Sequence, residues 1–355
     1  MTDRDGGTGP PPRRGPGHGR PVCPVGDVVA AAQRVERPDD VVAVIHGTTD
    51  PTLIADQIDD VLVAVGRRSP VVACRFHVAS VGSVTGVVLA DGDDLVVKAY
   101  QPAWRCSFLR AVVEVQARLA DGGIPCATPV GGPVRCGRGF ATVETNLADP
   151  GQPDAFGERE RSASAEGLAR VVGLAGRDDR LADHPLRRPH PGLYPPPHSP
   201  LFDFEATADG AGWIDDLARV ARSHRRDTPM VTAHTDWTAR NVRLRADGVC
   251  AVYDLDSLAA VSLPSALGLA ASTWRALGVA GEPAAPDLDE IEDWFERYPA
   301  VLSVADRRAA LAAALYGLCY TARCEHAIDP AEELHRRARP TLRLDADRYR
   351  RALTG

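Results

Sequence analysis

Asp236, Asn241 and Asp254 are the residues of this chain whose types and spacing best suggest chemistry. Asp236 and Asn241 are five positions apart, and Asp254 follows eighteen positions after Asp236. Phosphoryl transfer from a nucleotide needs few protein groups: a carboxylate that orients the attacking hydroxyl, and oxygen ligands that hold magnesium on the phosphates. These three side chains could supply both, so the stretch predicts a phosphoryl-transfer site.

The sequence around these residues predicts a loop followed by a β-hairpin. Two β-type runs, residues 241–245 and 249–253, flank a turn at Asp247-Gly248, and Asp-Gly is a strong signal for a tight hairpin turn. A hairpin brings Asn241, before its first strand, beside Asp254, after its second. Two hard oxygen ligands would then lie on one edge, which suits Mg²⁺.

Length and composition indicate a globular protein. The 355 residues suggest about two domains, and the 44% apolar and 25% charged residues are typical of a globular chain. The net charge of −7 argues against a nucleic-acid binder, which normally has a basic face. No apolar run approaches the roughly 20 residues that span a bilayer, so we expect no membrane segment.

Residues 1–25 are rich in proline and glycine and contain no apolar core of a signal peptide. Such sequence cannot bury enough surface to become ordered, so we predict a disordered tail. The eight cysteines form no C-x-x-C pair, which favours free thiols and a cytoplasmic protein.

The texture of the chain predicts an α+β fold of two lobes. Three β-type runs at 71–78, 84–90 and 95–100 form a meander, a helix is expected over 107–120, and two short strands follow. After a Pro-, Gly- and Asp-rich linker, the chain becomes mainly helical apart from the hairpin. We therefore expect an N-terminal lobe over 26–145, a C-terminal lobe over 146–355 and a ligand site between them.

The stretch from His234 to Asp256 resembles the aminoglycoside phosphotransferase (APH) family of the protein-kinase-like superfamily. The family pattern is H-G-D-x-x-x-x-N followed by an aspartate at a strand end, and His234, Asp236, Asn241, Asp254 and Asp256 match it. The same Asp-to-Asn spacing occurs in the catalytic loop of protein kinases. The resemblance is strong over the hairpin and implies a bilobal, protein-kinase-like fold over roughly residues 70–330.

The resemblance also implies a role for each matching residue. Asp236 would be the catalytic carboxylate that accepts or orients the proton of the acceptor hydroxyl. Asn241 and Asp254 would bind magnesium, and Asp256 would join as a further metal-side group. His234 would support the loop rather than transfer protons, because a lone histidine in such a loop is more often structural.

Nucleotide-binding residues are expected in the N-terminal lobe. Lys98 would meet the nucleotide phosphates, since a lysine on an apolar strand must send its ammonium to a partner or to water. Glu114, sixteen residues on, would be the helix carboxylate that steadies it. Ser83 lies in the stretch where a phosphate-covering loop belongs, and Glu144 and Asn146 lie where the family's hinge binds adenine. A solvated lysine and an ordinary surface glutamate are the alternatives for Lys98 and Glu114.

Two departures from the family pattern concern the support of the loop. Thr235 stands where the family has glycine, so the loop must adopt a conformation that a β-branched residue tolerates. Gly268 stands near the position at which the family commonly has an aspartate that supports the loop. The absence of this aspartate implies that another residue supports the loop, or that the loop is looser and the chemical step slower.

The predicted function is transfer of the γ-phosphoryl group of ATP or GTP, with Mg²⁺, to a hydroxyl of a small molecule such as an antibiotic, a sugar or an amino alcohol. The alternative is a nucleotide-binding pseudokinase that acts as a regulatory or interaction module. A predicted helix has an acidic run, which comprises Asp287, Asp289, Glu290, Glu292, Asp293 and Glu296. We interpret this run as a solvated face. The minority interpretation is a binding site for a cationic acceptor.

Overall fold

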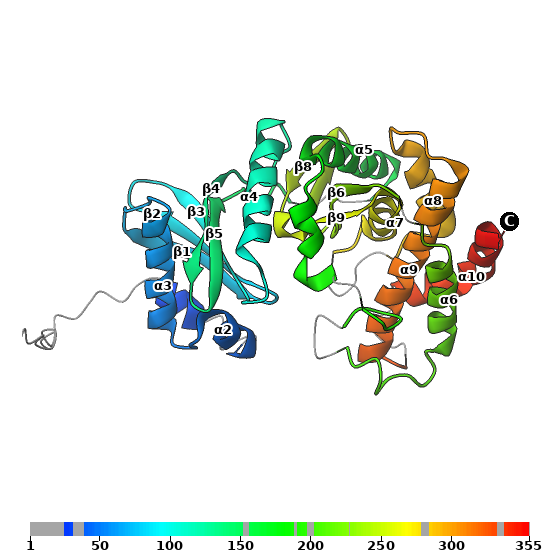
Figure 1. Cartoon of the computed structure of the whole chain (residues 1–355), viewed down its shortest axis with the longest axis horizontal. Coiled ribbons are helices and arrows are strands. Elements are labelled where there is room, and N and C mark those ends of the chain that lie inside the picture. The colour runs from blue at the N-terminus through cyan, green and yellow to red at the C-terminus, as the bar shows by residue number, and fades with distance from the viewer. Residues whose placement is uncertain are drawn as a thin grey trace, which may run out of the picture.

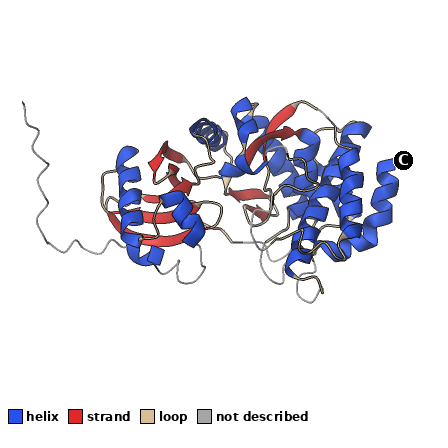
Figure 2. Ribbon diagram, turned by 60° about the horizontal axis from the view of Figure 1, so that its bottom comes forward, coloured by secondary structure: helices blue, strands red, loops and turns tan. Residues whose placement is uncertain are grey.

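The computed structural model describes residues 25–30, 39–151, 156–187, 190–196, 202–226, 228–277, 284–331 and 337–354. The chain folds into two bodies (Figures 1 and 2): a small lobe, the described residues up to Thr145, and a large lobe, those from Phe156 onward. The predicted disordered tail lies outside the described residues, except for Val25, which begins a helical segment over 25–30. The expected α+β class, with a β-rich lobe and a larger helical lobe, is confirmed.

A five-stranded antiparallel sheet with the order β1-β2-β3-β5-β4 forms the small lobe. Valine-rich runs favour extended backbone, because β-branched side chains pack well on a pleated surface, and the predicted meander over residues 71–100 is present. The strands are β1 (Val71–Ala79), β2 (Ser83–Leu89), β3 (Asp94–Tyr100), β4 (Pro129–Cys136) and β5 (Gly139–Thr145).

The alternation of side chains along β3 determines where Lys98 points. Val97 and Ala99 are buried in the core on one face of the sheet, which is the face of the N-terminal helices. Lys98 lies between them and therefore leaves the opposite face, as Tyr100 does. Tyr100 belongs to the core that extends into the large lobe, so Lys98 faces the lobe junction.

Helices lie on both faces of this sheet (Figure 1). α2 (Asp39–His46), which the sequence did not predict, and α3 (Pro51–Ala64) share one core with it. α3 begins at Pro51, because the Asp50 side chain accepts a hydrogen bond of 2.9 Å from the Thr52 amide, a standard N-cap. α4 (Cys106–Asp121) lies on the other face, and its buried residues belong to the core of the large lobe.

The large lobe contains two small two-stranded sheets surrounded by helices. The hairpin predicted around Asp247-Gly248 is β7 (Val242–Arg245) and β8 (Gly248–Val252). β6 (Met230–His234) pairs with β9 (Leu258–Ser262), a strand that the sequence did not predict. The helices are α5 (Glu158–Ala175), α6 (Gly212–Ser223), α7 (Leu263–Thr273), α8 (Leu288–Arg297), α9 (Val304–Ile328) and α10 (Ala338–Thr354).

Two properties of the chain bear on the expectations about membranes and thiols. Among the described residues, none of the helices combines the length and apolar character needed to cross a bilayer. The cysteines that the structure describes are all free thiols.

Candidate functional site

The loop between β6 and β7 presents Asp236 to solvent on a buried support. Asp236 is exposed, whereas the flanking Thr235 and Trp237 are buried. The Thr238 amide donates to the Asp236 carbonyl at 2.9 Å, and the Asn241 amide donates to the Thr238 carbonyl at 2.9 Å. These tight turns fix the backbone of the loop. The carboxylate of Asp236 therefore projects from a rigid loop into solvent, where another molecule can contact it.

His234 joins the loop to the end of the hairpin. Its ring is buried, its Nδ1 accepts from the Asp236 amide at 3.3 Å, and its Nε2 lies 2.9 Å from the Tyr253 carbonyl. Because Nδ1 accepts a hydrogen bond, Nε2 must hold the proton of the neutral ring and donate it to Tyr253. Both nitrogens therefore serve the backbone, which agrees with a supporting role for His234.

The loop has other supports in place of the aspartate that Gly268 replaces. The Thr235 hydroxyl and amide both donate to the Ser257 carbonyl, at 2.7 and 3.1 Å, and Trp237 Nε1 donates to the Ser164 carbonyl at 3.1 Å. At Gly268, a Cβ atom would lie 2.2 Å from the carbonyl oxygen of Ala310 on α9. The close packing of α7 on α9 thus excludes any side chain there, and the loop is held by Thr235, His234 and Trp237 instead.

Asn241 and Asp254 meet at the base of the hairpin, as the sequence predicts. The Tyr253 amide donates to the Asn241 carbonyl at 2.8 Å, so the residues before β7 and after β8 are neighbours. Asn241 Nδ2 donates to Asp236 Oδ2 at 2.7 Å, which makes Oδ1 the atom that could bind a cation. The side chains of Asp236 and Asn241 are thus hydrogen-bonded to each other, and the backbone of Asn241 is bonded to the residue that precedes Asp254.

Asp254 has an unusual backbone conformation. Its φ of 57° and ψ of 44° are left-handed, and among the described residues it is the one non-glycine residue with positive φ. This conformation costs roughly 1 kcal/mol for an L-residue and redirects the chain into the short 3-10 turn Leu255–Ser257. Ser257 Oγ donates to Asp254 Oδ2 at 3.2 Å, which orients the carboxylate.

Lys98 pairs with carboxylates from both lobes. Its Nζ lies 3.0 Å from Glu144 Oε1, on the neighbouring strand β5, and 3.5 Å from Asp256 Oδ1, in the large lobe. All three side chains are largely buried, with exposed fractions of 10, 13 and 18%. Lys98 is thus the point at which the small lobe is attracted to the aspartates that follow the hairpin.

The expected partnership between Lys98 and Glu114 is wrong. Glu114 lies on the exposed side of α4, and its carboxylate accepts a 2.5 Å hydrogen bond from Arg180 of the large lobe. The helical period places Glu114 away from the sheet, whereas Gln116, two residues on, is buried and faces it. No motif in the sequence indicates a role for Gln116.

Ser83 and Asn146 have different surroundings from those expected of nucleotide contacts. Ser83 begins β2, and its hydroxyl is buried without a hydrogen-bond partner. The Asn146 amide donates to the Asp94 carbonyl at 2.8 Å, and its Nδ2 donates to Asp94 Oδ1 at 3.1 Å. Both donors of Asn146 are therefore used within the small lobe, and the side chain of Glu144 is used by Lys98.

The cluster formed by Lys98, Glu144, Asp254 and Asp256 (the junction cluster) contains more negative than positive charge. Burial and the neighbouring carboxylate of Asp254 raise the pKa of Asp256 to about 8. For Asp254, burial opposes ionisation, but the Lys98 ammonium and a hydrogen bond from Asp256 hold its pKa below the ordinary value. Burial lowers the pKa of Lys98, yet the attraction of Glu144 and Asp256 outweighs it and holds the pKa well above its ordinary value.

The donor set at this position suits magnesium. No three His, Cys, Asp or Glu side chains converge as a metal site in the part of the chain that the structure describes. Magnesium needs fewer, because one or two carboxylates and the substrate phosphates commonly hold it. Asp254, Asn241 Oδ1 and Asp256 are hard oxygen donors, and Asp256 Oδ1 is a buried atom that accepts no hydrogen bond. The residues therefore fit a small divalent cation.

The composition of the chain also points to Lys98. Lys98 is the only lysine of the chain, and every other member of the 41 lysines and arginines is an arginine. Arginine forms forked pairs with carboxylates, whereas lysine is a compact point charge. A chain that otherwise uses arginine throughout has a lysine at a buried strand position that faces the lobe junction.

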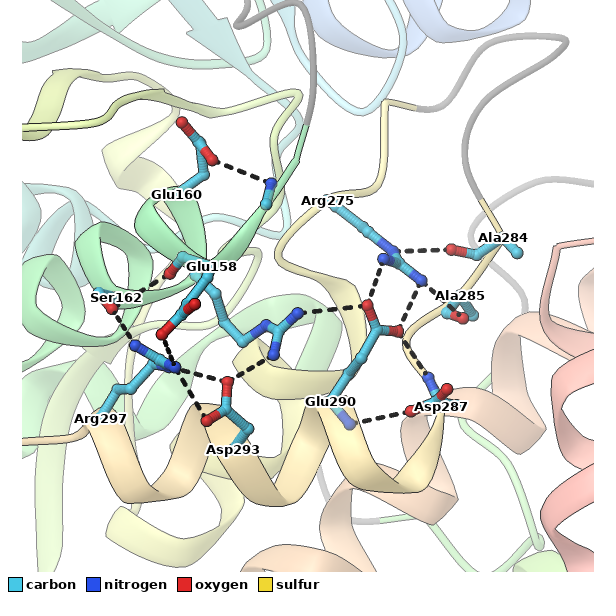
Figure 3. A network of polar contacts seen from close by, with 12 residues as sticks. Glu158, Glu160, Ser162, Arg275, Ala284, Ala285, Asp287, Glu290, Asp293 and Arg297 are labelled. Carbon is cyan, nitrogen blue, oxygen red and sulfur yellow. Dashed lines mark hydrogen bonds and ion pairs between the residues drawn. The ribbon is translucent and has the colours of Figure 1, made fainter.

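The acidic run on α8 does not form an open anionic surface. Figure 3 shows that arginines occupy it: Arg275 donates to both oxygens of Glu290 at 2.7 and 2.8 Å, and Arg297 donates to both oxygens of Asp293 at 2.8 and 3.0 Å. Asp289 and Glu296 also pair with arginines, Arg348 and Arg307. A cationic acceptor would have to displace these side chains, so the minority interpretation of this helix is wrong at those four carboxylates.

No protein-family model matches the sequence, and no curated protein matches it. Among solved structures, the chain is similar to a spectinomycin phosphotransferase in complex with ADP and spectinomycin, with 12% identity, a TM-score of 0.49, and coverage of 83% of this chain and 92% of that one.

Two other solved structures have comparable likeness. An amicoumacin kinase has 10% identity and a TM-score of 0.45, with 79% and 88% of the two chains covered. An aminoglycoside phosphotransferase from Alicyclobacillus acidocaldarius has 14% identity and a TM-score of 0.47, with 80% and 91% covered. The solved structures similar to this chain thus include aminoglycoside phosphotransferases and related small-molecule kinases, the group that the motif from His234 to Asp256 resembles.

Proposed function

We propose that the protein transfers the γ-phosphoryl group of ATP or GTP to a hydroxyl group of a small molecule. The observation that supports this most strongly is the arrangement of Asp236. Its carboxylate is exposed on a rigid loop, is hydrogen-bonded to Asn241, and is joined through the hairpin to Asp254. Phosphoryl transfer depends mainly on positioning and electrostatic stabilisation, and a fixed carboxylate beside cation ligands provides both.

Asp236 would act on the acceptor. Its Oδ2 is oriented by Asn241 Nδ2, and the exposed carboxylate would accept the hydrogen bond of the attacking hydroxyl and take its proton as the phosphoryl group arrives. A protein that only binds a nucleotide has no need of this acceptor-side carboxylate. Asp236 is therefore the residue that separates a kinase from the pseudokinase alternative.

Lys98 and the metal-side residues would act on the nucleotide. The Lys98 ammonium would bind phosphate oxygens, which would replace part of its contact with Asp256. Asn241 and Asp254, with Asp256 beside them, would hold Mg²⁺. When bound, magnesium neutralises phosphate charge and orients the transferred group. The surplus of carboxylates over cations in the junction cluster is the electrostatic reason why a divalent cation would bind there.

The base of the nucleotide would lie against the segment that follows β5. The amides of Thr145 and Asn146 already donate to the Thr128 and Asp94 carbonyls. We therefore place the adenine contact from Leu147 onward rather than at the side chains of Glu144 and Asn146. The acceptor would be a small hydroxylated molecule, an antibiotic, a sugar or an amino alcohol, that can approach Asp236.

The test is magnesium-dependent nucleotide consumption measured across a panel of hydroxylated small molecules. Asp236→Asn should lower turnover with an active acceptor by roughly 10²–10⁴-fold, the usual contribution of a general base. Asp247→Asn is the matched control, because Asp247 is an exposed aspartate at the turn of the same hairpin, and it should retain wild-type turnover. Equal turnover in Asp236→Asn and wild type would remove Asp236 from the mechanism.

A binding measurement separates the kinase from the pseudokinase. Mg·ATP should raise the melting temperature of wild type and of Asp236→Asn alike, since the acceptor-side carboxylate does not bind the nucleotide. Stabilisation of both proteins, with no acceptor-dependent turnover in wild type over a broad panel, would favour the pseudokinase.

A further inference from the structure

Gln116 is a buried polar residue on an otherwise apolar side of α4. Its neighbours on that side include Val112, Val115 and Leu119, all buried, and the exposed fraction of Gln116 itself is 4%. Its Nε2 donates to the Ala127 carbonyl at 2.9 Å and to Glu144 Oε2 at 2.8 Å. Both hydrogens of the amide nitrogen are therefore used, one by the backbone and one by the carboxylate that pairs with Lys98.

The two oxygens of Glu144 have different partners. Oε1 lies 3.0 Å from Lys98 Nζ, and Oε2 accepts from Gln116. A glutamate carboxylate can otherwise rotate freely about its last torsion. Held at both oxygens, it presents Oε1 to the lysine in one orientation, so the position of the Lys98 ammonium depends on the amide of Gln116.

α4 packs on the sheet and is also anchored to the large lobe. Glu114 pairs with Arg180, and Arg105 pairs with Asp183 at 2.7 Å. The ring of His184 packs edge-to-face against Phe108, with ring centroids 5.3 Å apart. Gln116 thus reaches from a helix attached to the large lobe to the ion pair of the small-lobe sheet.

We infer that Gln116 is a positioning residue for Lys98, acting through Glu144, and that it transmits the placement of α4 to the phosphate-binding lysine. This inference rests on the proposed function, in which Lys98 binds nucleotide phosphates. In protein kinases a helix glutamate contacts the strand lysine directly. Here the carboxylate is on strand β5, and the helix contributes a neutral amide that orients it.

The first test uses the single lysine of the chain as a reporter. An amine-reactive acetyl ester at fixed pH modifies Lys98 and the N-terminal amine, which peptide mass spectrometry resolves. Gln116→Leu should be modified at Lys98 several-fold faster than wild type, because the released carboxylate no longer holds the ammonium in one place, and Glu144→Gln should be modified faster still. Gln57→Leu is the matched control, since Gln57 makes a similar bond, 3.0 Å to the His46 carbonyl, on α3.

The second test measures nucleotide use. Hydrogen bonds to charged groups contribute about 1.5–3 kcal/mol, so Gln116→Leu should raise the KM for ATP about tenfold or more and leave the KM for the acceptor unchanged. The exchange variant Gln116→Glu with Glu144→Gln retains one carboxylate and one amide in contact, and should recover much of the loss that each single change causes. A purely structural role would lower the melting temperature of Gln116→Leu without this rescue of ATP affinity.

The outcomes separate this inference from the proposed function. Wild-type Lys98 modification and wild-type KM for ATP in a folded Gln116→Leu would overturn the positioning role. If wild type neither binds Mg·ATP nor consumes it, the proposed function fails, but the modification rates still decide whether Gln116 holds Lys98 through Glu144. If Gln116→Leu does not fold, the exchange variant alone decides: rapid Lys98 modification in it would contradict the inference.

Discussion

Two groups of opposite charges in this molecule differ in how their charges balance. In the junction cluster, one ammonium, Lys98, faces the carboxylates of Glu144, Asp254 and Asp256. The second group, the α8 network, consists of Glu158, Arg161, Arg275, Glu290, Asp293 and Arg297 (Figure 3). Its arginines and carboxylates are equal in number.

The difference appears in the states of the carboxylates. Hydrogen bonds from Arg297, opposed by some burial and aided by Arg161, hold the pKa of Asp293 below its ordinary value. In the junction cluster, the pKa of Asp256 is raised to about 8 by burial and by Asp254, and Asp256 Oδ1 accepts no hydrogen bond. The α8 network is complete without a ligand, whereas the junction cluster needs a further cation to ionise fully.

The junction cluster and the α8 network also differ in the basic residue that they contain. Forked arginine pairs, such as Arg275 on Glu290, fix two side chains together and suit a structural network. A lysine ammonium is a compact charge with three rotatable donors, which can exchange a carboxylate for a phosphate oxygen. The comparison therefore predicts that changes in the junction cluster alter activity, and changes in the α8 network alter stability.

The largest expected effect is on turnover. Asp254→Asn should lower turnover by about 10²–10³-fold, the usual cost of removing one group that stabilises transition-state charge. Its melting temperature without ligand should equal or exceed that of wild type, because the change removes charge from a cluster with too many carboxylates. Steady-state kinetics and thermal unfolding check both parts, and a large loss of stability would show that the cluster is balanced after all.

The next effect is ligand stabilisation. At a concentration 100 times its dissociation constant, Mg·ATP should stabilise the fold by roughly 2.7 kcal/mol, measured as a rise in melting temperature. Asp254→Asn should lose most of this rise. Arg161→Met should retain it in full, since Arg161 pairs with Glu290 and Asp293, both outside the junction cluster; a smaller rise in this variant would mean that the two groups are coupled.

A smaller effect is expected on stability alone. Arg161→Met removes one partner of a partly exposed network, and the free energy of unfolding should fall by roughly 1–3 kcal/mol, less than for a fully buried pair because solvent screens the charges. Turnover per folded molecule should remain that of wild type. Arg219→Met, in an exposed pair with Asp216, is the control and should change the free energy of unfolding by at most about 0.5 kcal/mol.

The last effect concerns pH, and its sign differs between the two groups. Asp256 binds a proton more tightly in the folded chain, so its contribution to stability should decline as pH rises from near 4 to about 8. Asp293 has a lowered pKa in the folded chain, so its contribution is present above its ordinary pKa and is lost on acidification. The free energy of unfolding, measured against pH without ligand, should show this decline between about pH 4 and pH 8 in wild type and not in Asp256→Asn. An unchanged decline in Asp256→Asn would assign it to another group.

Much of the fold could be predicted because its signals are local. The meander over 71–100, the helix at α4 and the hairpin at Asp247-Gly248 follow from β-branched runs, helical periodicity and turn chemistry. β9, which consists of small and apolar residues, is a strand because it pairs with β6. That pairing partner is more than twenty residues away along the chain, so no local pattern of Leu258–Ser262 could reveal it.

The candidate site also has features that could be predicted from the sequence and features that could not. That Asn241 lies beside the residue preceding Asp254 could be predicted, because a hairpin brings its two ends together. The partner of Lys98 could not: the sequence favoured Glu114, and whether Glu114 reaches Lys98 depends on which side of α4 faces the sheet. Likewise, only the packing of α9 on α7 shows why Gly268 cannot be an aspartate.

The sequence by itself determined the chemistry available to this protein: a loop aspartate, metal-type oxygens at the ends of a hairpin, and one lysine on an apolar strand. These depend on residue type and short-range spacing, which the chain encodes directly. The tertiary structure alone decided the electrostatics, because Lys98, Glu144 and Asp256 come from segments far apart in the chain. Charge balance and burial in the junction cluster exist only once the two lobes pack together.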